Sequence, residues 1–242
     1  ELLLSIPFFT LMGAILERSG LAEDLLNGFA KLFGGLPGGL AYAVIVVGAI
    51  LGAITGTVAA SVIAIGVIAL PVMLRYGYQP RLATGVVAAS GTITQVIPPS
   101  LVLIVLADQL GKSVGDMYLG AIGPSIAQIL IFLLFIFILS LIKPKLMPPL
   151  PKEARTPFGW DLIKTVVLAI LPSMALIFVV LGTIFMGLAT PTEAGAMGVV
   201  GAMLLAALHR RLHWQMMWQG MQSTMNITVM VIFILIGATV FT

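Results

Sequence analysis

The chain has 242 residues, of which 60% are hydrophobic and 9% are charged, whereas about 25% of the residues in an ordinary soluble domain are charged. This composition excludes a water-soluble globular protein. The net charge of +3 is small and comes from the loops, so it gives no indication of nucleic-acid binding. The absence of cysteine excludes disulfide bonds, thiolate metal sites and cysteine nucleophiles.

Long apolar runs without charged residues recur along the chain. They cover residues 40–74, 82–107, 117–142, 165–192, 194–208 and 212–242. Because one helical crossing of a membrane takes about 20 apolar residues, the runs predict an all-α polytopic membrane protein embedded in a lipid bilayer. The chain begins and ends inside apolar runs, so we expect it to be a fragment of a longer subunit.

The run at 40–74 is too long for one untilted crossing and too short for two crossings with a turn. Its centre, GAITGTVAAS at 52–61, combines glycine with hydroxyl residues. We interpret the run as a re-entrant hairpin with arms at 40–54 and 58–74, each roughly 22–25 Å long at the helical rise. The alternative is a single tilted helix with an exposed end.

The next run is interrupted near its centre by AASGTITQVIPPS at 88–100. Pro98 and Pro99 remove two amide donors, and Gly91 before them weakens a helix, so we predict a discontinuous helix at 82–111. Non-helical backbone at membrane depth persists only where protein buries it or where it lines an aqueous cavity, and such breaks form substrate and ion sites in secondary transporters. The alternative is a proline kink whose hydroxyl groups bond back to the preceding turn.

Basic residues concentrate in alternate loops. The segments 75–81, 143–164 and 209–214 are basic, whereas 108–116 carries two aspartates and one lysine. The positive-inside rule therefore predicts that the three basic segments are cytoplasmic and that 108–116 lies outside.

A proline-rich cytoplasmic linker at 143–160 divides the predicted membrane region. Residues 1–142 would form a first membrane half, and 161–242 would form the start of a second half. We expect residues 143–157 of the linker to tolerate a short insertion, because loops accept added length at a small entropic cost.

A short internal repeat relates the two halves. FTLMGAI at 9–15 returns as FILIGAT at 233–239, with Phe, Leu, Gly and Ala in register. By the predicted topology, the first copy runs inward and the second runs outward. This arrangement predicts an inverted repeat, which is typical of many secondary transporters.

Two polar motifs accompany the later runs. Thr190-x-x-Glu193 has the spacing of a capping box, with Pro191 at the first helical position, so we interpret Glu193 as a structural cap. The alternative is an intramembrane functional site, because Glu193 is the only acid in a long apolar region. His209 and His213 have an i, i+4 spacing that could hold a metal, but the arginines between them and the tryptophan after them favour the start of an interfacial helix.

Several stretches together resemble the large membrane subunit of the tripartite ATP-independent periplasmic (TRAP) transporters. They are IPFFTLMGAILERSGLAEDLL, ITGTVAAS, LPVMLRYGYQPRLATGVVAASGTITQVIPPS and GLATPTEAGAMGVVGA. The resemblance implies an elevator-type transporter in a bacterial inner membrane, with no enzymatic activity and no cofactor. It also implies Na⁺-coupled import of a carboxylate-containing organic acid, together with a small membrane subunit and a periplasmic solute-binding protein.

The resemblance implies site residues as well. In such folds the first hairpin tip and the adjacent helix break form one Na⁺ site, which corresponds here to Thr55, Gly56, Thr57, Ser90, Gly91 and Thr92. The substrate-binding candidates are Thr94, Gln95, Pro98, Pro99 and Ser100. A second hairpin and a second ion site are expected after residue 242. The TGT tip differs from the more usual serine-containing form of the family.

Two other functions are compatible with these patterns: a Na⁺/H⁺ antiporter and a non-transporting scaffold subunit whose breaks serve helix packing. Proton coupling usually requires Asp, Glu or His within the membrane, and the run with the break has none. Its hydroxyl and carbonyl oxygens favour coordination of Na⁺, a hard cation that prefers oxygen ligands.

Overall fold

A computed structural model describes residues 2–151 and 160–241, and within these residues the chain is helical without β-strands. The helices are η1 (Leu2–Leu4), α1 (Ser5–Arg18), α2 (Leu21–Phe33), α3 (Gly39–Thr55), α4 (Val58–Arg75), α5 (Pro80–Thr92), η2 (Ile93–Gln95), α6 (Leu101–Leu110), α7 (Val114–Ile142), η3 (Pro144–Leu146), α8 (Trp160–Phe185), α9 (Pro191–Leu208) and α10 (Trp214–Phe241). Four helices in this part of the chain are long and apolar enough to cross a membrane: α4, α7, α9 and most of α10. The prediction of an all-α polytopic membrane protein is confirmed.

Helices α3 and α4 form the predicted hairpin, and they are joined by only two residues. Gly56 adopts a left-handed conformation with φ of 61°, and Thr57 is extended. Glycine suits this turn because a β-carbon disfavours positive φ. The arms have 17 and 18 residues, slightly more than expected.

Both ends of the hairpin lie at the same end of the bundle. Before α3, the Gly38 amide donates to the Met147 carbonyl over 3.0 Å. After α4, the Gln79 amide donates to the neighbouring Leu146 carbonyl over 3.0 Å. The Leu40 amide also donates to the Tyr78 hydroxyl over 3.2 Å. We call this region, where segments 34–38, 76–79 and 143–151 meet, the hairpin base.

The hairpin tip lies well short of the far end of α7. Helix α7 starts at Val114 and returns to the hairpin base at Ile142. The Ser125 hydroxyl of α7 bonds to the Val96 carbonyl in the helix break, and the hairpin tip lies beside Pro99, three residues further on. Because Ser125 is 11 residues from Val114, α7 continues roughly 16 Å past the break. The tip and the far end of α7 are therefore at different heights, and the re-entrant character of the hairpin stays a prediction.

Segment 143–151 is packed, although the sequence predicts an unpacked linker. Met147 is fully buried, Leu150 is 6% exposed, and the Leu150 amide donates to the Gly34 carbonyl over 2.9 Å. This packing argues against the predicted tolerance of these residues to insertion, because an insertion would displace buried side chains and bonded amides. Residues 152–159 lie outside the described part, and their tolerance stays a prediction.

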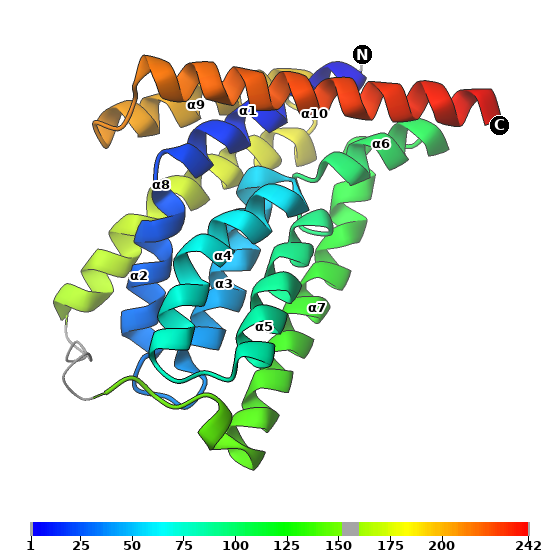
Figure 1. Cartoon of the computed structure of the whole chain (residues 1–242). Coiled ribbons are helices and arrows are strands. Elements are labelled where there is room, and N and C mark those ends of the chain that lie inside the picture. The colour runs from blue at the N-terminus through cyan, green and yellow to red at the C-terminus, as the bar shows by residue number, and fades with distance from the viewer. Residues whose placement is uncertain (1, 152–159, 242) are drawn as a thin grey trace.

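Helix α1 runs antiparallel to α10, and with α9 and α10 it lies across one end of the α3–α7 bundle (Figure 1). The Arg18 guanidinium at the end of α1 donates to Gln219 Oε1 over 2.8 Å and to Ser223 Oγ over 2.9 Å, both near the start of α10. The two copies of the internal repeat therefore lie on antiparallel helices. Helix α1, which belongs to the predicted first half, packs directly on α9 and α10 of the predicted second half. The division into two halves at the linker stays a prediction.

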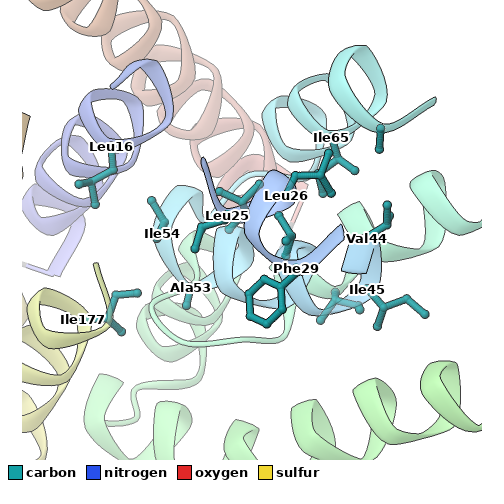
Figure 2. Packing of buried hydrophobic residues seen from close by; sticks show 14 of the residues in the cluster. Leu16, Leu25, Leu26, Phe29, Val44, Ile45, Ala53, Ile54, Ile65 and Ile177 are labelled. Carbon is teal, nitrogen blue, oxygen red and sulfur yellow. The ribbon is translucent and has the colours of Figure 1, made fainter. Parts of the chain in front are cut away.

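A continuous apolar core connects α1 with the hairpin helices α3 and α4 through α2. Figure 2 shows Leu25, Leu26 and Phe29 of α2 packed among side chains of α3 and α4, with Leu16 of α1 beside them. The α2 residues recur at positions i, i+1 and i+4, so one face of this amphipathic helix is buried. Helix α2 thus connects α1 to the hairpin.

Candidate functional site

The hairpin tip meets the start of α6. A β-carbon built on Gly56 would lie 3.3 Å from the Pro99 carbonyl oxygen and 3.8 Å from the Leu101 amide nitrogen. The tip therefore lies next to the Pro98–Ser100 segment, whose residues are substrate-binding candidates by the family resemblance. For Thr55, only the backbone is described.

The predicted helix break is present at the expected place. Helix α5 ends at Thr92, a short 3₁₀ turn covers Ile93–Gln95, and α6 begins at Leu101. The two prolines leave the carbonyls of Thr94 and Gln95 without helical amide donors. The Ser100 hydroxyl bonds to the Gln95 carbonyl over 2.7 Å.

The α3 arm packs closely along this break. A β-carbon built on Gly48 would lie 2.6 Å from Ser90 Cβ, and one on Gly52 would lie 2.8 Å from Thr94 Cα. These glycines give α3 a flat face, so that the backbone of the break can approach it. Ser90 and Thr94 are both fully buried.

The two triplets of predicted Na⁺ ligands lie at different heights along the hairpin. Ser90 faces Gly48, seven residues before Thr55, which corresponds to roughly 10 Å along α3. Gly91 faces Val62 on the other arm, where a β-carbon on Gly91 would overlap Val62 Cγ2. The structure thus brings the tip to Pro99 and Ser100, and it brings Ser90 and Gly91 to the hairpin arms. Their joint role in ion binding stays a prediction.

The hydroxyl groups of Ser90, Thr92 and Thr94 donate to backbone carbonyls three or four residues earlier in the chain. The Ser90 hydroxyl bonds to the Val86 carbonyl, Thr92 Oγ1 donates to the Ala89 carbonyl over 2.7 Å, and Thr94 Oγ1 donates to the Gly91 carbonyl over 2.9 Å. This is the pattern expected for a proline kink with back-bonded hydroxyls. A hydroxyl that donates its proton keeps lone pairs that can bind a cation, so the pattern is also compatible with an ion site.

Two helix N-termini converge beside the tip, a feature that the side-chain pattern did not reveal. Helix α4 follows an extended Thr57, and α6 follows an extended Ser100, with no side-chain cap on either. The first amides of a helix lack intrahelical acceptors, and the helix dipole adds partial positive charge there. The signal in the sequence was the hydroxyl residue directly before each apolar run, Thr57 and Ser100.

Glu193 has the structural role that its motif predicts. The Thr190 amide donates to Glu193 Oε2 over 2.8 Å, and the Glu193 amide donates to Thr190 Oγ1 over 3.3 Å. This reciprocal capping box opens α9 with Pro191 in the first turn, so the interpretation of Glu193 as a cap is confirmed. Elsewhere in the described chain no three His, Cys, Asp or Glu side chains gather as a metal site, and His209 Nδ1 lies 2.8 Å from the Leu205 carbonyl.

The sequence model of the family described as "Tripartite ATP-independent periplasmic transporter, DctM component" matches residues 1–242. The chain belongs to this DctM family. The predicted resemblance is therefore confirmed, and the hairpin and the broken helix are features of a TRAP transporter large permease chain.

Individual DctM-family proteins match over most of the chain. The C4-dicarboxylate TRAP transporter large permease protein of Pseudomonas aeruginosa is 31% identical over 240 residues, covering 99% of this chain and 55% of that protein. Its counterpart of Vibrio cholerae is 34% identical, covering 84% and 44%. The ectoine TRAP transporter large permease protein of Halomonas elongata is 30% identical, covering 84% and 46%. The chain thus spans about half the length of these relatives.

Proposed function

We propose that the protein imports a carboxylate-containing organic acid together with Na⁺ across the inner membrane. The substrate is delivered by a periplasmic solute-binding protein, and the large subunit works with a small membrane subunit. The observation that carries this proposal is the meeting of the hairpin tip with the start of α6, where Gly56 lies beside Pro99 and Leu101. Membership of the DctM family supports the transport role and the two partners.

The convergent helix N-termini favour an anionic substrate. The opening amides of α4 and α6 supply hydrogen-bond donors with partial positive charge, which is a suitable environment for a carboxylate. No Asp or Glu occurs between residues 82 and 107, so no fixed negative charge in this segment opposes the anion. The names of two matching relatives specify C4-dicarboxylate and a third specifies ectoine, which shows that the family binds different solutes.

The oxygen atoms around the break favour Na⁺ as the coupling ion. Pro98 and Pro99 leave carbonyls without helical donors, the Pro99 carbonyl faces the tip, and Thr57 and Ser100 contribute hydroxyl oxygens nearby. Hard cations are bound by such oxygen ligands. Exchange of Na⁺ for H⁺ at this break is disfavoured, because the segment 82–107 contains no Asp, Glu or His that could carry the proton.

A Na⁺ titration of uptake tests the proposal. The complete transporter, reconstituted with its small subunit and solute-binding protein, is compared with Thr57→Ala, Thr92→Ala and Thr84→Ala. Thr84 is a matched control, because it is an exposed threonine of α5 whose hydroxyl bonds to Pro80 in the same way, over 2.9 Å. We expect Thr57→Ala and Thr92→Ala to raise the Na⁺ concentration for half-maximal uptake several-fold, and Thr84→Ala to leave it unchanged.

Three results would contradict the proposal. Uptake that is independent of Na⁺ would exclude Na⁺ coupling, and uptake accompanied by counter-movement of protons would favour an antiporter. An equal effect of all three alanine variants would mean that the hydroxyls only stabilise the helix, as in a structural kink.

A further inference from the structure

An apolar groove lies between α5 and α7 on the side of α3. Both helices pack against α3, and the groove between them has a volume of about 440 Å³. Its lining residues are Ile45, Arg81, Leu82, Gly85, Val86, Ala89, Ile131, Phe132, Phe135 and Ile136. Arg81 is the one polar side chain of this lining, so the groove combines an apolar channel with a single cation.

The cation lies at one end of the groove. Arg81 is the second residue of α5, which starts at the hairpin base, and the apolar lining of α5 continues to Ala89, roughly 12 Å further along the helix. Arg81 is exposed, and among the described residues its guanidinium forms no ion pair. Gly85 lies midway, exposed, and a β-carbon there would have no atom within 4 Å. The groove is therefore open at its middle, beside Gly85.

The described connecting segments at the Arg81 end of the groove carry basic but no acidic residues. The connecting segments of the hairpin base, 34–38, 76–79 and 143–151, contain no Asp or Glu. They carry Lys143 and Lys145, and Arg75 and Arg81 flank them. A phosphate at this end would meet only positive side chains of these segments, whereas a cationic ligand would be repelled.

We propose that this groove binds an anionic glycerophospholipid, with its phosphate at Arg81 and one acyl chain along Gly85 and Ala89. An acyl chain gains little by leaving other lipids for a protein groove, because lipid tails are as apolar as the groove itself. The preference must therefore come from the headgroup, and clusters of basic residues at a membrane surface select anionic lipids. The guanidinium fork suits phosphate better than an ammonium group does.

Native mass spectrometry of the full-length protein tests this site. The protein is equilibrated in detergent with equal amounts of dioleoyl phosphatidylglycerol and dioleoyl phosphatidylcholine, which differ only in the headgroup. The wild type should retain phosphatidylglycerol in excess. Arg81→Gln should lower the ratio of the two bound lipids roughly fivefold, the effect expected for one arginine near an anionic headgroup. Arg75→Gln is the matched control, since Arg75 is an exposed cation at the same end that does not line the groove, and its ratio should stay at the wild-type value.

A second pair of changes tests the groove itself. Gly85→Phe places a ring in the open part of the groove, and Gly85→Leu places a smaller, aliphatic side chain there. Both should reduce bound phosphatidylglycerol. A photo-crosslinking residue at Ala89 should attach to lipid. Equal retention of the two lipids, or an equal loss in Arg75→Gln and Arg81→Gln, would overturn the proposal. Unchanged lipid binding in a folded Gly85 variant, or crosslinking to polypeptide, would show that protein rather than lipid covers the groove.

Discussion

Gly91 of α5 lies directly against Val62 of α4. A β-carbon on Gly91 would overlap Val62 Cγ2 and would come within 3.0 Å of the Val62 amide nitrogen and Cα. The backbone of Gly91 is helical and has no positive φ. Glycine is therefore required here for the close approach of two helices and not for an unusual backbone conformation. The same contact holds the second arm of the hairpin against the broken helix.

The first prediction concerns this contact. Gly91→Ala should lower the free energy of unfolding by about 1–3 kcal/mol, because the added methyl overpacks a site where backbone atoms cannot move aside. Gly85→Ala on the same helix has open space around it and should raise the stability by about 0.5–1 kcal/mol, since alanine favours a helix. Thermal unfolding in detergent measures both. A stabilising Gly91→Ala would show that α4 and α5 are less closely packed than described.

The second prediction concerns the hydrogen bond that joins the two ends of the hairpin. Tyr78 is 3% exposed, and its hydroxyl accepts the amide of the buried Leu40. Tyr78→Phe should cost about 1–2 kcal/mol, because it leaves that amide without its acceptor. Unfolding of the variant and the wild type at neutral pH measures the difference. A change below a few tenths of a kcal/mol would mean that the bond does not stabilise the hairpin base.

The third prediction is a pH dependence of the same residue. Burial raises the pKa of Tyr78 from 10.0 to about 12, against the smaller opposing effects of the Leu40 and Ala41 amides. The fold thus favours the neutral phenol. The contribution of the Tyr78 hydroxyl to stability is complete below pH 10 and is lost as the pH rises from 10 towards 12. The difference in stability between the wild type and Tyr78→Phe should shrink over this interval, and a difference that grows would contradict the sign.

The fourth prediction concerns the sidedness of the hairpin. The chain has no cysteine, so single cysteines can be labelled without background. Gly35, Gln79 and Lys145 are exposed at the hairpin base, and Lys112 is exposed near the opposite end of α7. Cysteines at the first three positions should react with an impermeant maleimide from the cytoplasmic side, and one at position 112 from the other side. Labelling of positions 35 and 79 from opposite sides would exclude the re-entrant hairpin.

The fifth prediction concerns segment 143–151. A six-residue Gly-Ser insertion after Met147 should destabilise the full-length protein, because it separates the Gly38 and Gln79 contacts of Leu146–Met147 from the Gly34 contact of Leu150. The same insertion between residues 154 and 155 should be tolerated, as expected for a linker. Monodispersity and unfolding temperature of the two proteins measure the difference. Equal stability of both would show that the contacts of this segment are dispensable.

The local chemistry of the chain determined much of this protein by itself. Apolar run lengths indicated an all-α membrane protein, and Gly56 and the Pro98–Pro99 pair marked a hairpin turn and a helix break that the structure places at these positions. The capping box at Thr190 was also predictable. These features depend on a few neighbouring residues, because a missing amide, a missing β-carbon or a capping side chain acts within one helical turn.

Only the tertiary structure decided which of these features meet. The hairpin tip could have been placed against Ser90–Thr92 or against Pro99, and the packing of Gly48 and Gly52 on the break places it at Pro99. Likewise the apolar residues Met147 and Leu150, hidden among prolines in a short loop, gave no periodic signal of burial. Such contacts join residues far apart in the chain, and they depend on helix crossing and side-chain volume across the whole core, which no local pattern records.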